Sequence, residues 1–376
     1  MAGLADGVLM PFFALWARHR AGVPTGWIGL LLGCYAGGEL LATPLVGGIA
    51  DRLGRRPVLL ASTAGIGLGF LLLCSTRGAV PAGLALLLIG AFESVLHPTA
   101  AAVVADVAPP GSLRRRFALT RTASGAGHVV GPVLGALLAG RSLDLVFAGP
   151  AVAMLAAAVL VAALLPETAA PGTRADDGDD DDAAALLAAF RDRRLAALLL
   201  PLAVLEVASS WIEAVLPLAA TGTGALAPSG VGLLFAWGGI AAVAFQLPVA
   251  RWSAGMTGFA VAATSGGLLA LAFGSLLASS ALPALVAAVT LVAFAGMLSG
   301  PLAQAIVAEL APPAARATYL AAFGTVQDLR DAAGPAMGTA LFAASATLPW
   351  LAGVPVVLAA SLALASATRR HEASSG

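Results

Sequence analysis

The sequence predicts an all-α polytopic membrane protein in which twelve transmembrane helices form two six-helix bundles. Three observations lead to this fold class. The chain is 59% hydrophobic and 11% charged, whereas soluble domains carry about 25% charged residues. Its apolar residues gather in long runs, and short arginine-rich turns separate many of these runs. A bilayer accommodates so much apolar surface because its interior is itself an apolar solvent.

Six apolar runs in residues 1–165 predict the first bundle. Met1 leads directly into the first run, so we expect no cleavable signal peptide. That run is close to the lower limit of about 17–25 residues that can span a bilayer. The predicted helices cover residues 2–17, 27–50, 57–74, 80–104, 117–140 and 143–165.

An acidic segment, residues 166–194, divides the chain. It contains six aspartates within residues 176–182, and such a run favours a solvated linker. A calcium site is the alternative, but a flexible run lacks fixed ligand geometry. The second bundle, residues 195–368, precedes a tail at residues 369–376. Its predicted helices cover residues 195–218, 230–250, 257–279, 282–305, 319–343 and 348–367.

The arginines predict the orientation of the helices. Fourteen of them fall on the side of the linker and of both termini, and four fall on the other side. Cytoplasmic loops carry an excess of basic residues. We therefore expect a multi-pass protein of the plasma membrane, the inner membrane of a bacterium, with both termini in the cytoplasm. Arg18 and Arg20 lie on the minority side.

The two halves of the chain repeat at one offset. Residues 104–110, VADVAPP, match residues 307–313, VAELAPP, at an offset of 203. The pair Gly131-Pro132 and the pair Gly334-Pro335 match at the same offset. Six helices repeated in the same order imply two bundles related by a pseudo-twofold axis along the membrane normal.

A short basic loop between the second and third predicted helices carries a distinctive pattern. Its residues are Gly47, Asp51, Arg52, Gly54, Arg55 and Arg56. The pattern resembles the signature loop of the major facilitator superfamily. This resemblance implies transport by alternating access, with Asp51 and the arginines latching the inner ends of the bundles. Asp106 is then an expected partner of Arg52 or Arg55. The alternative is an ordinary basic loop after a membrane helix.

A glycine-rich stretch in the fifth predicted helix resembles the antiporter motif of the same superfamily. Its residues are Gly127, Gly131, Pro132 and Gly135. The family pattern ends in two glycines, and here Ala136 replaces the second. The resemblance implies export rather than import, whereas close helix packing is the alternative explanation. Family members that couple to protons often carry an arginine within helix four. Residues 86–90 contain none, which weakens that route of coupling.

Ionisable residues within the predicted spans are the candidates for proton and substrate binding. Each costs about 2.5–3.5 kcal/mol on insertion scales, so those that persist tend to be functional. Some could instead be hydrogen-bonding groups at helix contacts. A rise of about 1.5 Å per residue places Glu39, Glu93 and Glu206 at similar depth. The candidates are Asp6, Glu39, Glu93, Glu206, Glu213, His128, Arg330 and Asp331.

One pair across the two halves is predicted from depth together with the family resemblance, which implies that the second and eleventh helices pack together. Glu39 and Arg330 both lie twelve residues from the inner end of their helices. Asp331 is adjacent to Arg330 in sequence and points about 100° away on a helix. We therefore expect Glu39 to pair with Arg330. This pair either breaks during the transport cycle or statically holds the interface.

The sequence thus predicts a secondary active transporter that exports a small amphipathic compound in exchange for protons. A symporter or facilitator for a sugar or an organic acid is the first alternative, and a non-transporting receptor of the same fold is the second. Expected partners are the substrate, protons and the bilayer. The formal net charge is zero, which gives no footprint for a nucleic acid. We expect a monomer without enzyme activity, cofactor or metal.

Overall fold

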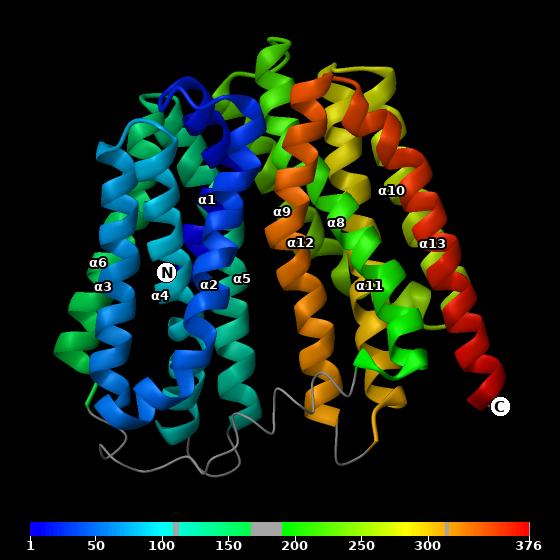
Figure 1. The fold of residues 1–376 in the computed structure, drawn as a ribbon, viewed down its shortest axis with the longest axis horizontal. Helices are drawn as coiled ribbons and strands as arrows, with labels where there is room; N and C mark the ends of the chain where they lie inside the picture. Colours follow the sequence, from blue (N-terminus) through cyan, green and yellow to red (C-terminus); the bar gives the residue numbers. More distant parts are fainter. Residues whose placement is uncertain (108–112, 167–189, 313–315, 376) are drawn as a thin grey trace. The chain divides into compact units, whose positions relative to one another are not determined.

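The computed structural model describes residues 1–107, 113–166, 190–312 and 316–375. Within these helices, some side chains lie outside the description: those of residues 43–52, 105–106, 113–118, 121–122, 308, 316–317, 320–321 and 374–375. The described residues form twelve α-helices (Figure 1). They are α1 Ala2–His19, α2 Thr25–Leu53, α3 Arg55–Ser75, α4 Ala79–Val107, α5 Leu113–Ala139, α6 Leu143–Leu164, α8 Arg193–Gly222, α9 Pro228–Ser253, α10 Gly258–Ala278, α11 Leu282–Leu310, α12 Arg316–Ala344 and α13 Leu348–Ser375.

Each predicted helix corresponds to one of these helices, and the prediction of an all-helical chain is confirmed. The break between α2 and α3 is a single residue, Gly54, whose φ of 90° favours glycine because side chains rarely adopt it. The last helix, predicted to end at residue 367, continues to Ser375, so it includes most of the predicted tail at residues 369–376. Arg369 and Arg370 therefore lie inside the last helix rather than at its end.

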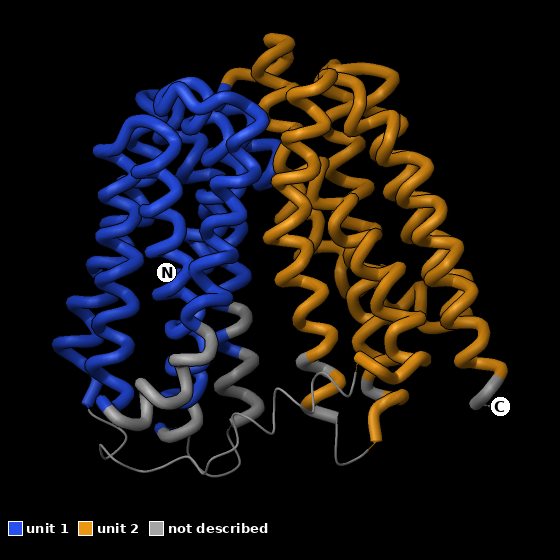
Figure 2. The backbone as a smooth tube through the Cα atoms, viewed as in Figure 1, with its two compact units in different colours: residues 1–178, 228–236 blue, residues 179–227, 237–376 orange. Residues whose placement is uncertain are grey.

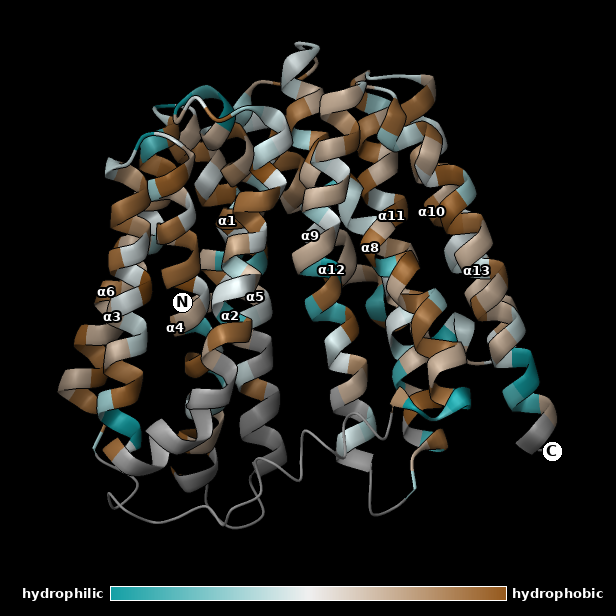
Figure 3. Ribbon diagram, in the orientation of Figure 1, coloured by the Kyte–Doolittle hydropathy of each residue, from teal (hydrophilic) through white to brown (hydrophobic). Residues whose placement is uncertain are grey.

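Eight of the described helices are long and apolar enough to cross a membrane: α3, α4, α6, α8, α9, α10, α11 and α13. The helices outside this set include α1, which carries Asp6, and α12, which carries Asp328, Arg330 and Asp331. Most helices are mainly hydrophobic along their length, with isolated hydrophilic residues between the ends (Figure 3). Several large apolar side chains are exposed, such as Leu164 at 74%, as expected of a surface that faces lipid.

The chain divides into two compact units (Figure 2). Unit 1 comprises residues 1–178 with the first turns of α9, residues 228–236, and unit 2 comprises the remainder. In unit 1, α1 packs on α5 and α6, and α3 packs on α4 and α6. In unit 2, α8 packs on α12 and α13, and α10 packs on α11 and α13. These are equivalent helix pairs under the 203-residue repeat. The predicted domain limits and the twofold relation remain predictions.

Two close helix contacts also follow the repeat. A Cβ at Gly131 would lie 2.6 Å from the carbonyl oxygen of Leu4 and 3.1 Å from the Cα of Gly7. A Cβ at Gly334 would lie 3.1 Å from the carbonyl oxygen of Val207 and would overlap Ser210. Residues 4 and 207 are again 203 apart, as are residues 7 and 210. The α1–α5 and α8–α12 crossings are therefore built in the same register.

Candidate functional site

Glu93 is the centre of a polar cluster inside unit 1. Its carboxylate is buried, with 4% of the residue exposed. The Tyr35 hydroxyl donates a hydrogen bond of 2.8 Å to Oε2 of Glu93. One turn further along α4, Nε2 of His97 lies 3.6 Å from Oε1 of Glu93. The carboxylate thus has a polar neighbour on each of its two oxygens, and no arginine is among them.

Asp6 extends this cluster to α1 and α5. Oδ2 of Asp6 lies 3.6 Å from Nε2 of His128, and the Asp6 and Glu93 carboxyl groups are close enough to share a hydrogen bond. Imidazoles and carboxylates therefore alternate from His128 through Asp6 and Glu93 to His97. Glu39 lies near enough to interact electrostatically with Asp6 and His97. Four helices of unit 1 contribute to this set of groups, which we call the unit 1 cluster.

The unit 1 cluster can chemically do two things. Alternating carboxyl and imidazole groups can pass a proton between neighbours, because each group both accepts and donates. Ligand atoms of Asp6, Glu93 and His97 also lie within 4.8 Å of one another, a set that could hold a divalent cation. Tyr35 already occupies one Glu93 oxygen, which favours the first use.

Sequence reasoning missed Tyr35. It lies one helical turn before Glu39 on α2, so the two side chains share a face. The chain contains only two tyrosines, and this one is 8% exposed. A buried tyrosine usually finds a hydrogen-bond partner for its hydroxyl. A lone tyrosine on the same helix face as a candidate carboxylate is the signal that could have revealed it.

Arg330 on α12 is the centre of a second cluster, inside unit 2. Its Nη2 lies 2.5 Å from Oε2 of Glu213, and its Nη1 lies 3.3 Å from Oδ1 of Asp331. Its Nε lies 3.8 Å from Oε2 of Glu206 but is buried without a hydrogen bond. We call Arg330 with these three carboxylates the unit 2 cluster. One positive charge faces three carboxylates, so a proton or a cation would relieve the excess negative charge.

These contacts give Arg330 carboxylate partners other than Glu39, the partner predicted for it. The argument for Glu39 assumed that Asp331 points away from Arg330, yet the two side chains form an ion pair. Long side chains can turn back along a helix, which the 100° rule for Cβ directions does not capture. Arg330 finds its carboxylates within its own unit. The argument that Arg330 needs an anion from the other half of the chain therefore no longer holds, and the pairing with Glu39 stays a prediction.

The repeat identifies the unit 1 residues that are equivalent to those of the unit 2 cluster. At the 203-residue offset, Arg330 corresponds to Gly127 and Glu206 corresponds to Gly3. In unit 1 these two glycines meet, because a Cβ at Gly127 would lie 3.3 Å from the Cα of Gly3. The same helix crossing therefore carries a backbone contact in unit 1 and an ion pair in unit 2. His128 corresponds likewise to Asp331, so each unit has its titratable groups at the same crossing.

The signature loop is described only in part. Nη1 of Arg55 donates to the carbonyl of Ala102 on α4 at 3.2 Å, and Nη2 of Arg56 donates to the carbonyl of Ala162 on α6 at 2.6 Å. These bonds hold the start of α3 against the ends of two neighbouring helices. The side chains of Asp51, Arg52 and Asp106, and the surroundings of Gly47, lie outside the described residues. The predicted latch thus stays a prediction.

The antiporter-like stretch forms a tight contact between three helices of unit 1. Gly131 and Gly135 face α1, where a Cβ at Gly135 would overlap the ring of Phe12. Ala136, which departs from the family pattern, faces Gly232 in the first turns of α9. A Cβ at Gly232 would lie 2.8 Å from that of Ala136 and 2.6 Å from the carbonyl oxygen of Pro132. The missing glycine on α5 is thus matched by one on α9.

A third polar group lies at the other end of unit 1, away from the signature loop. Asp144, in the first turn of α6, accepts from Nε1 of Trp16 at 3.2 Å and from Nε of Arg20 at 2.5 Å. Nη2 of Arg77 lies 3.3 Å from the same carboxylate. Two of the four arginines on the minority side therefore have a structural role that the charge count could not reveal.

Comparisons with known proteins agree with this architecture. The profile of the Major Facilitator Superfamily matches residues 1–225. The tetracycline resistance protein class C of Escherichia coli is 37% identical over 131 residues, which cover 33% of this chain and 31% of that protein. The class G protein of Vibrio anguillarum is 33% identical over 168 residues, covering 43% and 42%. The matched stretches thus span less than half the length of these relatives.

Solved structures share the fold over nearly the whole chain. The human organic anion transporter MFSD10 superposes with a TM-score of 0.63 at 21% identity, covering 96% of each chain. A nucleoside transporter superposes with a TM-score of 0.72 at 15% identity, covering 98% of each. The resemblance inferred from the signature loop is confirmed. The chain is a multi-pass membrane protein that resembles drug efflux transporters, and it belongs to the major facilitator superfamily.

Proposed function

We propose that this protein is a secondary active transporter that exports a small amphipathic compound in exchange for protons. The observation that carries the proposal is the unit 1 cluster, in which Glu93 is buried between Tyr35, His97 and Asp6. Carboxylates are retained inside membrane-spanning helices at a cost, and they mark proton relays and substrate paths. Here the cluster has no arginine among its named contacts, so a proton is the natural partner for its excess negative charge.

Two further features support export. The antiporter-like stretch on α5 keeps its glycines in close contact with α1, and the matched relatives include tetracycline resistance proteins. The termini and the acidic linker then lie in the cytoplasm of a cell whose plasma membrane holds the protein. Alternating access would proceed by rocking of the two predicted bundles.

The unit 2 cluster has a complementary part in this scheme. Its three carboxylates exceed the single charge of Arg330, and they would attract a proton or the positive end of an amphipathic substrate. Binding of either would change the balance of charge around Arg330. Such a change is the kind of local event that biases a two-state element. We assign the unit 1 cluster to proton transfer and the unit 2 cluster to the substrate.

The test uses everted membrane vesicles from cells that express the full chain. A panel of fluorescent or radiolabelled compounds, including tetracycline and a lipophilic cation, is added outside, and respiration acidifies the interior. Export predicts uptake of at least one compound, which nigericin abolishes because it collapses the pH gradient. Vesicles from cells that lack the protein are the control. Uptake that persists unchanged without a pH gradient would contradict proton coupling, and uptake of none would remove the support for export.

A further inference from the structure

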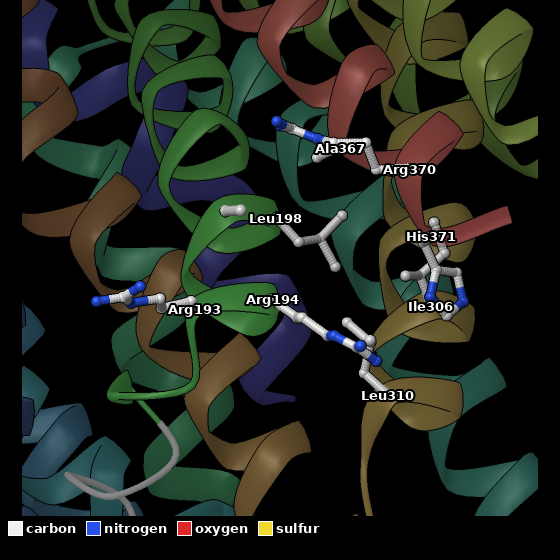
Figure 4. Close-up of a pocket in the computed structure, with 9 residues that line it drawn as sticks. Arg193, Arg194, Leu198, Ile306, Leu310, Ala367, Arg370 and His371 are labelled. Carbon is white, nitrogen blue, oxygen red and sulfur yellow. The ribbon is translucent and has the colours of Figure 1, made fainter. Parts of the chain in front are cut away.

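The base of unit 2 holds a pocket that the proposed transport reaction does not use. It lies where α8 begins, where α11 ends and where α13 passes its last turns (Figure 4). The cavity volume is about 310 Å³. Its lining residues are Arg193, Arg194, Ala197, Leu198, Ile306, Leu310, Ala367, Arg370 and His371. The pocket therefore combines an apolar floor with cationic side chains.

Figure 4 shows how these side chains lie. Arg194 extends from α8 toward Leu310, and the Arg370 side chain runs beside Ala367 on α13. Leu198 lies between them, and it is 2% exposed. The two side chains extend in opposite directions, so their guanidinium groups lie on opposite sides of the apolar Leu198, at the end of three helices. In a membrane protein, this is the level at which the phosphates of the lipid headgroups lie.

The carboxylates at this end of unit 2 are already occupied. Asp192 accepts from the Tyr319 hydroxyl at 2.8 Å and from the backbone amide of Arg194 at 2.8 Å. Glu309 lies 3.1 Å from Nε2 of His371, and Glu372 accepts from the backbone amide of Gly258 at 2.5 Å. Partial burial opposes the ionisation of Asp192, but these hydrogen bonds and the positive charge of Arg194 outweigh it and lower the pKa of its carboxyl.

The arginines of the pocket, by contrast, form no ion pair with a described carboxylate. In the part of the chain that the structure describes, no carboxylate oxygen lies within 4.0 Å of a guanidinium nitrogen of Arg193, Arg194 or Arg370. Neutral donors form the hydrogen bonds of Asp192 and Glu372, a histidine serves Glu309, and Arg194 acts on Asp192 through its charge without forming an ion pair. The local charge balance therefore favours an added anion. Arginine matches phosphate especially well, since its planar fork can donate two parallel hydrogen bonds.

The apolar surface continues from the pocket along α8. Leu200 and Val204 follow Ala197 at intervals of three and seven residues, which places them on one face of the helix. They are 68% and 46% exposed. A free phosphate would use only the arginines, whereas a phospholipid would also cover this apolar stripe with its acyl chains. We propose that the pocket binds the phosphate of an anionic phospholipid, with Arg194 and Arg370 as its principal ligands.

The test is lipid binding by the purified, delipidated full-length protein in detergent, followed by native mass spectrometry. Phosphatidylglycerol and phosphatidylcholine with identical acyl chains are compared, and inorganic phosphate serves as a competitor. The double variant Arg194→Gln, Arg370→Gln is compared with Arg369→Gln. Arg369 is a neighbour of Arg370 that does not line the pocket. Circular dichroism and size-exclusion chromatography verify that all three proteins are folded.

We expect the wild type to prefer phosphatidylglycerol, and the double variant to lose affinity for it by about thirtyfold, which corresponds to about 2 kcal/mol for two arginines near a lipid phosphate. Arg369→Gln should bind as the wild type does. Equal binding of both lipids, or unchanged binding by the double variant, would overturn the proposal. Full displacement of phosphatidylglycerol by inorganic phosphate would replace the lipid by a free anion and overturn it as well. Transport activity does not enter the measurement, so failure of the proposed export would leave this result intact.

Discussion

At the scale of single residues, the two tyrosines of the chain offer a matched pair. Each donates a hydrogen bond of 2.8 Å to a carboxylate: Tyr35 to Glu93 in unit 1, and Tyr319 to Asp192 at the base of unit 2. A hydrogen bond to a charged group contributes about 1.5–3 kcal/mol. Only the first of these bonds belongs to the cluster assigned to proton transfer, so the two tyrosines should differ in their effect on transport.

We predict that Tyr35→Phe slows proton-driven transport by about tenfold or more, because it removes one partner of a buried carboxylate. Tyr319→Phe should transport at close to the wild-type rate. Initial rates in everted vesicles, normalised to protein level by immunoblot, make the comparison. Equal rates for the two variants would show that the Tyr35 hydroxyl has no part in coupling.

Arg330 provides a second residue-scale prediction, and it separates the partner seen in the structure from the one predicted by depth. Arg330→Leu should lower the stability by less than the ~3–5 kcal/mol of a fully buried pair, because it leaves partly buried carboxylates without their counter-ion. Adding Glu213→Leu should recover part of this loss, whereas adding Glu39→Leu should not. Thermal unfolding of the purified variants in detergent measures both. Better recovery with Glu39→Leu would restore the original pairing.

The sequence predicted the depth of the candidate carboxylates in the membrane, but it did not predict which helices pack against one another. Counting residues at 1.5 Å each placed Glu39, Glu93 and Glu206 at one level. It did not tell which helix faces which, so Tyr35 was missed. The rotation of each helix and the reach of a long side chain are set by tertiary packing, and a hydrophobic pattern spread around the whole helix leaves both undetermined.

At the scale of helices, the repeat predicts where glycine is required. Gly131 and Gly334 lie against the backbones of α1 and α8, so a Cβ at either position forces the helices apart. In contrast, a Cβ at Gly125 on α5 or at Gly324 on α12 would have nothing within 4 Å. Each of these two helices thus also contains a control glycine at which a Cβ would meet no other atom.

We therefore predict that Gly131→Ala and Gly334→Ala lower the unfolding temperature of the purified protein. Gly125→Ala and Gly324→Ala should leave it unchanged or raise it slightly, since alanine is favoured over glycine in a helix by about 1 kcal/mol. Thermal unfolding in one detergent compares all four. Losses of similar size in all four variants would mean that helix propensity, rather than close packing, governs these positions.

The same repeat explains one success and one failure of prediction. The glycine and proline matches at the offset of 203 predicted equivalent crossings, and the packing of α1 on α5 and of α8 on α12 agrees with them. The exchange of Gly3 and Gly127 for Glu206 and Arg330 was not anticipated. The alignment was made through the residues that match, whereas the functional difference lies in residues that do not.

At the scale of the whole molecule, the sequence predicted the family and the helices well. Long apolar runs and the Gly54 break leave few alternatives, because backbone groups inside a bilayer must be satisfied within helices or closed barrels. The helices extend beyond the predicted bounds into polar residues, most clearly at Arg369 and Arg370. Hydropathy marks where a chain meets lipid, whereas a helix continues into water as long as its backbone and caps allow.

The signature loop gives a prediction at this scale. If Asp51 latches the bundles in one state of the cycle, Asp51→Asn should preserve expression and substrate binding but reduce turnover. Substrate binding by the purified variant and transport in vesicles are measured on the same preparation. Arg251→Gln is a suitable control, since Arg251 lies in the last turn of α9, the counterpart of α2 in the repeat. Wild-type turnover by Asp51→Asn at equal protein level would contradict the proposed role of Asp51 as a latch.

The central claim is that the unit 1 cluster couples protons to substrate movement, and Glu93→Gln tests it most directly. This variant keeps the size of the side chain and resembles the protonated carboxyl in carrying one donor and one acceptor group, but it cannot release a proton. Proteoliposomes that contain it are assayed for accumulation driven by a pH gradient and for exchange of labelled against unlabelled substrate without a gradient. The account predicts that accumulation is lost while exchange continues. Accumulation at the wild-type level, with exchange also intact, would contradict it.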